Sequence, residues 1–269
     1  MAFNPKFIDL TVDESGIATV TLARANVHNA FDIPLLEELE RNFYGLRRNK
    51  RVKVVVLQGE GRSFCAGADI NWMRAMKGYT RRQNIQESKH FARLFHMIND
   101  FPKPVIARVQ GAALGGGAGL VAICDYVIAE HEAVFGFTEV RLGIIPAVIA
   151  PFVIAKIGES YARAFFISGL RFTADKALDI GLVHEVVDPS ELNDRVQAIA
   201  SEFLLCGPEA MMKAKELVRD IIGINRGKRR NQLALIDHTA RAIADRRMSR
   251  EGQEGMDALL KHRKPNWTK

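Results

Sequence analysis

Two loops of small residues carry backbone groups that could do chemistry. The segments SFCAGADI (63–70) and QGAALGGGAGL (110–120) each follow a short apolar run and lead toward a stretch of helical character. Small side chains let a ligand approach the main chain, and glycine adopts backbone conformations that other residues avoid. Backbone N–H groups at a helix start have no partner inside the helix. If the loops face each other, one N–H from each could bind an oxygen that becomes negative during a reaction, as in an oxyanion hole.

A second interpretation of these loops stays open. The same glycines also permit close packing of a helix on a strand, and glycine-rich turns are weak signals of function. Neither loop carries the phosphate-binding GxxxxGK[ST] motif or a dinucleotide-binding fingerprint. Spacing alone therefore supports the oxyanion hole and simple packing equally.

The elements around the loops predict an α/β fold. Strands separated by helical segments favour a mostly parallel sheet with crossover connections, preceded here by one β-hairpin. Alternating or continuous apolar runs predict strands over 7–11, 17–22, 52–59, 105–109 and 126–130, and helical spacing predicts helices over 35–47 and 82–99.

From about residue 160 onward the pattern is chiefly helical. Thr173 is the expected cap of a helix over 173–182, and Asp188 is the expected cap of a helix with Pro189 at its first position. Further helices are expected over 209–222 and 229–245. We therefore divide the chain into a sheet-bearing core (1–198) and a helical extension (199–269), whose apolar stripes must pack on the core or on another subunit.

Composition narrows the class of protein. The net charge is +7, but the basic clusters lie apart and match no nucleic-acid-binding motif, which predicts solvated helix faces instead. The three cysteines are widely spaced, which favours reduced thiols and indicates no metal site. The N-terminus has no signal-peptide pattern, and the longest apolar run, 144–157, is shorter than the roughly 20 residues that span a bilayer. A cytoplasmic protein without membrane segments is expected.

Four motifs in order resemble the crotonase superfamily, which includes enoyl-CoA hydratases and isomerases. They are SFCAGADI, PKPVIARVQGAALGGGAGLVAICDYVIA, FGFTEVRLGIIP and EGMDALLKHRKPNW. The resemblance implies a crotonase-like spiral of ββα units, with a helical C-terminal region that mediates trimerisation, and hexamers built from two trimers. It implies an acyl-CoA thioester as substrate, so that coenzyme A is part of the substrate, and it implies no separate cofactor and no metal.

The resemblance also implies the catalytic groups. The N–H groups of Ala68 and Gly116 are expected to hold the thioester oxygen. Hydratases of this superfamily carry two glutamates, and here the first position is Gly119 while the second is Glu139. Burial beside apolar neighbours such as Phe135 would raise the pKa of Glu139 and suit it to proton transfer.

One glutamate is compatible with two reactions. It could take a proton from water and return it to C2 in a syn hydration, or it could move a proton between carbons in a Δ3,Δ2-enoyl-CoA isomerase. The segments AGADINWMRAM and RLGIIPAVIAPFVIAKIGE resemble bacterial hydratases of branched substrates such as 3-methylglutaconyl-CoA, which favours hydration. A different class, RNA binding through the basic segment 225–232, follows from a similar mammalian protein, but nonspecific charge is the preferred explanation.

The remaining candidates are substrate contacts that the resemblance implies. Asn71, Trp72, Arg74 and Arg141 are candidates for holding a distal carboxylate of the acyl group, and Asp69 or His131 for a second acid. The expected substrate-binding residues are Arg24, Ala25, Val27, Ala66, Asp69, Ile70, Trp72, Gly115, Gly119 and Lys261. For Lys261 and Lys264 two interpretations are equally open, contact with the 3′-phosphate of CoA or a solvated basic tail.

Overall fold

The computed structural model describes residues 7–76, 78–226 and 249–268. The described residues up to Ala200, apart from Pro102–Pro104, form a first compact unit. Pro102–Pro104 and the described residues from Ser201 onward form a second one. The division falls inside one helix, α7 (Leu192–Leu204), and the boundary drawn from the sequence after residue 198 stays a prediction.

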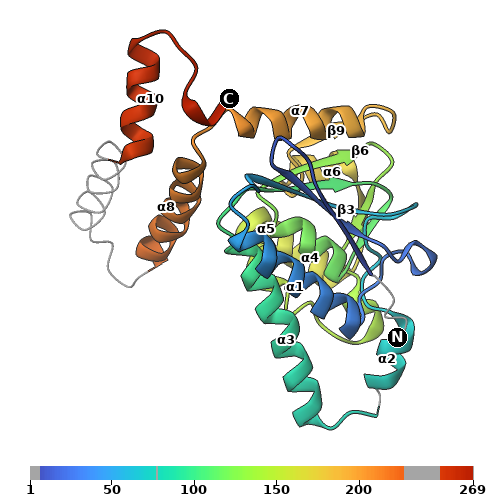
Figure 1. Cartoon of the computed structure of the whole chain (residues 1–269). Coiled ribbons are helices and arrows are strands. Elements are labelled where there is room, and N and C mark those ends of the chain that lie inside the picture. The colour runs from blue at the N-terminus through green and yellow to red at the C-terminus, as the bar shows by residue number, and fades with distance from the viewer. Residues whose placement is uncertain (1–6, 77, 227–248, 269) are drawn as a thin grey trace, which may run out of the picture. The chain divides into compact units, whose positions relative to one another are not determined.

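The first unit is built on a six-stranded sheet with the order β1-β2-β3-β4-β6-β9 (Figure 1). The strands β1 and β2 pair antiparallel as the predicted hairpin, and every other neighbouring pair is parallel. The mostly parallel sheet expected from the sequence is thus confirmed. The strands are β1 (Ile8–Val12), β2 (Ile17–Leu22), β3 (Val54–Gly59), β4 (Val105–Val109), β6 (Tyr126–Glu130) and β9 (Glu185–Val187).

A second sheet of three very short strands has the order β5-β7-β8. These strands are β5 (Ala112–Leu114), β7 (Val134–Gly136) and β8 (Arg171–Thr173). The sequence did not predict them, because three residues are too few for an alternating pattern to be visible. Since β5 lies inside the second glycine-rich segment, part of that segment is held by pairing with β7.

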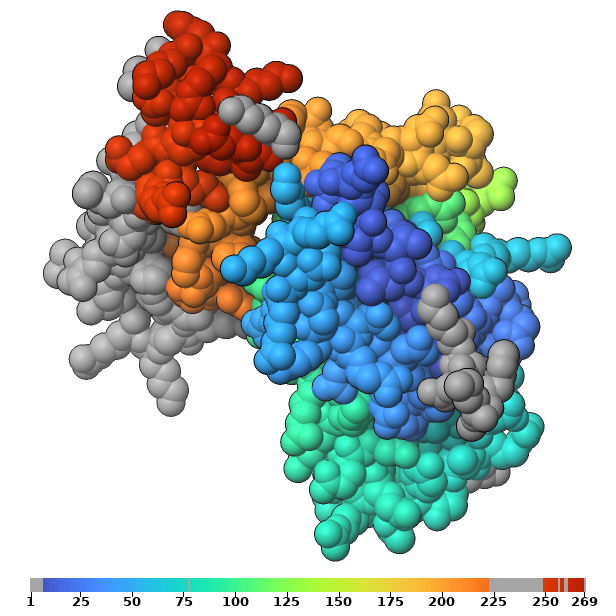
Figure 2. Space-filling model, in the orientation of Figure 1, coloured from blue at the N-terminus to red at the C-terminus, as the bar shows by residue number. Residues whose placement is uncertain are grey.

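The helices of the first unit bury their apolar faces, and several begin at a capping residue. The helix α1 (Ile33–Arg48) is capped by Asp32, whose carboxylate accepts from Leu35 N at 2.9 Å. The helix α3 (Arg81–Asn99) begins with a capping box between Thr80 and Gln83, and its green side chains lie against the blue side chains of α1 in Figure 2. The remaining helical elements are η1 (Ala25–Val27), α2 (Ile70–Met76), α4 (Gly116–Ala122), η2 (Glu139–Leu142), α5 (Ala150–Ser168) and α6 (Ala174–Asp179).

Two predicted helix starts have different outcomes. Thr173 caps α6 as expected, accepting from Lys176 N at 3.3 Å. The expected helix at Pro189 instead begins at Leu192. A turn comes first, in which Glu191 N donates to the Asp188 carbonyl at 2.9 Å, so the Asp–Pro pair starts a turn before the helix.

Three described helical elements lie wholly within the second unit. They are α8 (Pro208–Arg226), α10 (Arg250–Leu260) and η3 (Asn266–Thr268). The Glu251 carboxylate accepts from Glu209 N at 2.8 Å and Ala210 N at 2.6 Å, so α10 supplies a cap for the start of α8. The helix expected over 209–222 is part of α8, whereas the one expected over 229–245 lies outside the described residues. No described helix is both long and apolar enough to cross a membrane.

Candidate functional site

A cleft of about 870 Å³ in the first unit gathers the three residues that the sequence places at the centre of the chemistry. Ala68, Gly116 and Glu139 all line it. Its walls come from the loop before α2, from α2 and α3, from the start of α4, and from the stretch between η2 and α5. The two glycine-rich loops therefore face a common space.

Phe31 holds the first loop in place through its backbone. Phe31 N donates to the Gly67 carbonyl at 2.7 Å, and Asp69 N donates to the Phe31 carbonyl at 2.8 Å. These bonds flank Ala68, whose own N–H takes part in no hydrogen bond of the described residues. Gly67 has φ of +100°, a conformation that favours glycine. The position of the Ala68 amide is thus held by its neighbours, and its N–H remains able to donate a hydrogen bond to a ligand.

The second amide lies at the start of α4. Gly115 N donates to the Gly136 carbonyl at 2.8 Å, whereas Gly116 N, the next along the chain, has no acceptor within the described part of the chain. A Cβ at position 116 would lie 3.0 Å from the rings of Phe31 and Phe91, so glycine lets the main chain approach these rings. Phe31 therefore supports both amides, one through its backbone and one through its ring.

The two loops are joined directly by backbone hydrogen bonds. Cys65 N donates to the Ala112 carbonyl at 3.0 Å, and Leu114 N donates to the Cys65 carbonyl at 3.0 Å. A Cβ at position 117 would lie 2.1 Å from the Cys65 carbonyl oxygen, so only glycine fits there. Both hypotheses drawn from the glycines agree with this geometry, because the close packing is what places the amides.

Glu139 lies at the start of η2 with its carboxylate at the second loop. Its Oε1 is 3.3 Å from the place that a Cβ of residue 115 would occupy. Its Oε2 is buried and has no hydrogen-bond partner among the described residues. Burial raises the pKa of Glu139 above its ordinary value of 4.5, the direction expected from its apolar surroundings. The site therefore holds a carboxyl group suited to accept and release protons.

The place of the missing carboxylate is filled by an apolar side chain. A Cβ at position 119 would lie 2.3 Å from Ile149 Cγ2 and 2.9 Å from the Phe95 ring. Gly119 is buried and does not line the cleft, whereas Ile149 does. Gly119 makes room for Ile149, and its expected contact with the substrate stays a prediction. Nothing in the local sequence around Ile149 indicated this role.

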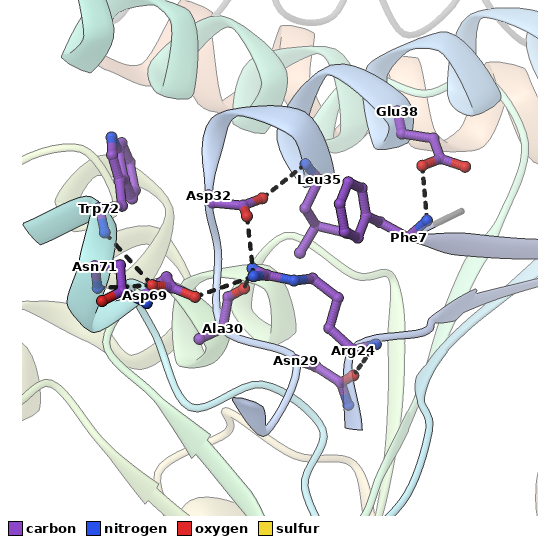
Figure 3. A network of polar contacts seen from close by, with 10 residues as sticks. All are labelled: Phe7, Arg24, Asn29, Ala30, Asp32, Leu35, Glu38, Asp69, Asn71 and Trp72. Carbon is purple, nitrogen blue, oxygen red and sulfur yellow. Dashed lines mark hydrogen bonds and ion pairs between the residues drawn. The ribbon is translucent and has the colours of Figure 1, made fainter. Parts of the chain in front are cut away.

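Arg24 and Asp69, both expected to contact the substrate, are bound to each other (Figure 3). Arg24 Nη2 lies 3.0 Å from Asp69 and 3.0 Å from Asp32, and Nη1 donates to the Ala30 carbonyl at 2.6 Å. The second oxygen of Asp69 caps α2, accepting from Asn71 N at 2.7 Å. Asp69 is therefore a helix cap and an ion-pair partner, and it is not available as a second acid.

Other expected contacts divide between cleft and surface. Ala66, Gly115 and Trp72 line the cleft. Three others, Ala25, Val27 and Ile70, lie outside its lining. His131 pairs with Asp175 at 3.5 Å on the surface, so it is not a second acid. Lys261 belongs to the second unit, where it pairs with Asp257 at 2.8 Å, and Lys264 belongs to that unit as well.

The candidates for a distal carboxylate of the substrate have other partners. Arg74 Nη1 donates to Asn71 Oδ1 at 3.0 Å, and Arg141 Nε donates to the Gly169 carbonyl at 2.7 Å. Of the four candidates, Trp72 alone lines the cleft, and no lysine or arginine appears among the described lining residues.

The sequence missed the part of the lining that comes from α3. Asn84, Glu87 and Ser88 line the cleft, and Glu87 Oε2 accepts from Trp72 Nε1 at 3.1 Å. In the sequence these polar residues looked like an ordinary solvated helix face, so no signal pointed to them.

The described residues contain no group of three or more His, Cys, Asp or Glu side chains that could hold a metal ion.

Comparison with known proteins gives one consistent family. Residues 13–269 match the model of a family described as enoyl-CoA hydratase/isomerase. The short-chain-enoyl-CoA hydratase of Clostridium acetobutylicum is 32% identical over 93% of this chain and 94% of its own length. Among solved structures, an enoyl-CoA hydratase from Shewanella pealeana has a TM-score of 0.91 at 37% identity, covering 97% of this chain and 96% of the other. AtuE from Pseudomonas aeruginosa has a TM-score of 0.91 at 33% identity, covering 98% and 100%.

Proposed function

The chain belongs to the enoyl-CoA hydratase/isomerase family of the crotonase superfamily, and on this premise we propose that it adds water across the C2=C3 bond of an acyl-CoA thioester. The observation that carries the proposal is the half-buried Glu139, whose buried Oε2 has no partner, in one cleft with two amides that have no acceptor among the described residues. Coenzyme A enters as part of the substrate, and no separate cofactor is proposed.

In this proposal the amides of Ala68 and Gly116 bind the thioester oxygen. Attack on C3 moves the π electrons toward the carbonyl, and the oxygen becomes the negative end of an enolate. Hydrogen-bond donors already in place stabilise this charge better than they stabilise the neutral carbonyl. The closely packed glycines hold the donors there before the substrate arrives.

Glu139 carries the proton. As a carboxylate it removes a proton from water while the water oxygen forms a bond to C3. The protonated carboxyl then delivers that proton to C2, the carbonyl re-forms, and Glu139 is again a carboxylate. A pKa raised by burial brings the acid and base forms closer in free energy, which helps a group that must be both in one turnover.

Isomerisation is the second candidate, favoured by the packing of Ile149 against Gly119. That contact leaves no room for the second carboxylate that would help orient a water molecule. Glu139 alone can remove a proton from C2 of a 3-enoyl thioester and return it to C4, which moves the double bond into conjugation. The same two amides would stabilise the same type of enolate.

The acyl group in our proposal is branched, because the segments around Trp72 and Ile149 resemble hydratases of branched substrates such as 3-methylglutaconyl-CoA. An apolar lining that includes Met73, Phe91 and Ile145 suits a methyl branch. The distal carboxylate of a glutaconyl group would meet Glu87 and no described cation. A branched acyl group without that charge therefore fits the described lining better.

We further propose that the chain acts in the cytoplasm as a trimer or hexamer, assembled through its helical C-terminal region. Exposed apolar side chains in the second unit, Leu205, Val218 and Ile222, support self-association. The basic segment 225–232 falls almost wholly outside the described residues, so no contact supports RNA binding, and acyl-CoA remains the proposed ligand.

The ultraviolet absorbance of a conjugated thioester separates the two reactions. Crotonyl-CoA loses this absorbance if water is added, and a 3-enoyl-CoA gains it if the double bond moves. We expect loss with crotonyl-CoA to be the faster reaction. Gain with the 3-enoyl-CoA alone would replace hydration by isomerisation, and no change with either substrate or with the branched 3-methylcrotonyl-CoA would reject both.

A further inference from the structure

We propose that Arg24 is a positioning residue for the Ala68 amide, because its guanidinium joins the two chain segments between which that amide is held. The inference rests on the proposed function, in which Ala68 N binds the thioester oxygen. Arg24 itself does not line the cleft and touches no substrate atom in this account.

Arg24 contacts both of the chain segments that hold Ala68 in place, 30–32 and 67–69. On one side, Arg24 binds the Ala30 carbonyl and the Asp32 carboxylate, the two residues that flank Phe31. On the other side it binds the carboxylate of Asp69, the residue after Ala68. Figure 3 shows the guanidinium pointing into the space between the two carboxylates. One planar group therefore connects the segment 30–32 to the segment 67–69.

The backbone connection between these segments is small. It consists of the two hydrogen bonds that Phe31 makes, one to Gly67 and one to Asp69, with Ala68 between them. One further backbone bond lies nearby, from Ala66 N to the His28 carbonyl at 2.9 Å, on the N-terminal side of both segments. The Arg24 side chain adds one more link, because it holds Asp69 on one side and Ala30 and Asp32 on the other, so the orientation of the Ala68 N–H depends on it.

The network is also well shielded from solvent. The side chains of Arg24, Asp32 and Asp69 are 14%, 20% and 7% exposed, and the Phe7 ring centroid lies 5.3 Å from the guanidinium carbon. Charge-assisted hydrogen bonds are stronger and shorter in such surroundings, and a guanidinium holds two partners in a fixed plane. A lysine offers one point charge and cannot hold both carboxylates and the carbonyl in the same geometry.

Both carboxylates have a second task that ties the network to helix starts. Asp32 caps α1 and Asp69 caps α2 with the oxygens that face the first-turn amides. Loss of Arg24 would leave two carboxylates close together without their cation. Their repulsion would push the segments 30–32 and 67–69 apart, which moves the Ala68 amide without removing it.

A spectroscopic probe reports the amide position without turnover. The probe is a para-amino-cinnamoyl-CoA thioester, whose absorption moves to longer wavelength when hydrogen bonds polarise its carbonyl. We expect the wild type to show this shift and Arg24→Met to show a clearly smaller one, with Arg24→Lys between them. We expect kcat with crotonyl-CoA to fall about tenfold in Arg24→Met, less than the ~10²-fold typical of losing a whole oxyanion-hole donor. KM should change far less.

A second variant keeps the test sound if Arg24→Met does not fold. Asp69→Asn retains a residue type that caps helices well but removes the charge that Arg24 binds. It should reduce the shift in the same direction. Arg195→Met is the matched control, because it removes an arginine paired with Glu185 away from the cleft, and it should leave the shift and kcat unchanged.

Each outcome has a distinct meaning. A normal shift and a normal kcat in folded Arg24→Met and Asp69→Asn would overturn the role of Arg24 while leaving the proposed function intact. Absence of any shift in the wild type with bound probe would reject the oxyanion hole itself. An equal loss in Arg195→Met would show general destabilisation and would also overturn the inference.

Discussion

The side chain of Ile149 occupies the space that any side chain at position 119 would need, since a Cβ there would lie 2.3 Å from Ile149 Cγ2. The site therefore has one carboxylate near the amides because the place of the other is packed with hydrocarbon. Position 119 therefore has no acidic side chain because the large apolar side chain of Ile149 fills the space it would need.

Gly119→Ala should accordingly be destabilised by overpacking, by about 1–3 kcal/mol in the free energy of unfolding. Ile149→Ala creates a cavity and costs about 2–5 kcal/mol alone. The double variant Gly119→Ala/Ile149→Ala should be more stable than the sum of the two changes predicts, because the shortened side chain removes the closest contact and leaves space for a small shift away from Ile149 Cβ and the Phe95 ring. Urea unfolding of the four proteins measures this coupling, and strict additivity would contradict the packing account.

The raised pKa of Glu139 predicts a stability effect with a definite sign. In the unfolded chain the carboxyl titrates near 4.5, and in the folded protein it titrates higher. Between these values the folded state binds more protons, so stability falls as the pH rises through that window. Glu139→Gln should remove this cost, and it should be more stable than the wild type at neutral pH but not below pH 4.5. Unfolding curves at both pH values test this; a destabilised Glu139→Gln at neutral pH would contradict it.

Cys65 reports whether the two loops stay closed. Its side chain is 0% exposed, and burial raises its pKa to about 12. At neutral pH the thiolate fraction is therefore very small, and a thiol reagent should not modify Cys65 in the native protein. Cys206 is exposed and should react readily, which provides an internal control. Peptide mapping after brief alkylation reads both; rapid modification of Cys65 would show that the loops open.

The cleft lining predicts a preference between two branched substrates. Since the described lining contains Glu87 and no cation, 3-methylcrotonyl-CoA should have a higher kcat/KM than 3-methylglutaconyl-CoA. Glu87→Gln should improve the charged substrate relative to the uncharged one by roughly fivefold, through loss of like-charge repulsion. Competition between the substrates measures the ratio. An unchanged ratio would show that the distal carboxylate does not approach Glu87.

Local patterns in the sequence were enough for much of the fold. The stripe of α1 and the cap at Thr173 are visible because they depend on neighbours within one or two turns. The strand β5 was missed because its stability comes from β7, which lies about twenty residues later. The motifs placed the two amides and Glu139 in one cleft through the family resemblance, since nothing local distinguishes that glutamate.

Some contacts depend on tertiary packing and could not be predicted from the sequence. Arg24 and Asp69 are 45 positions apart, and only the folded chain shows that each binds the other. The role of Asp69 as a cap of α2 could have been found, because an aspartate directly before a helical stretch is a typical start signal. The contact between Gly119 and Ile149 had no such signal, since it joins two elements through van der Waals packing alone.

The central claim is that Glu139 is the one group that moves the proton from water to C2, while the amides of Ala68 and Gly116 bind the thioester oxygen. Turnover of crotonyl-CoA by Glu139→Gln, compared with Glu87→Gln, tests it most directly, since these are the two carboxylates among the described lining residues. The account predicts that Glu139→Gln loses about 10²–10⁴-fold in kcat while crotonyl-CoA binding stays close to that of the wild type. Turnover by Glu139→Gln within a few-fold of the wild type, or a larger loss in Glu87→Gln, would contradict it.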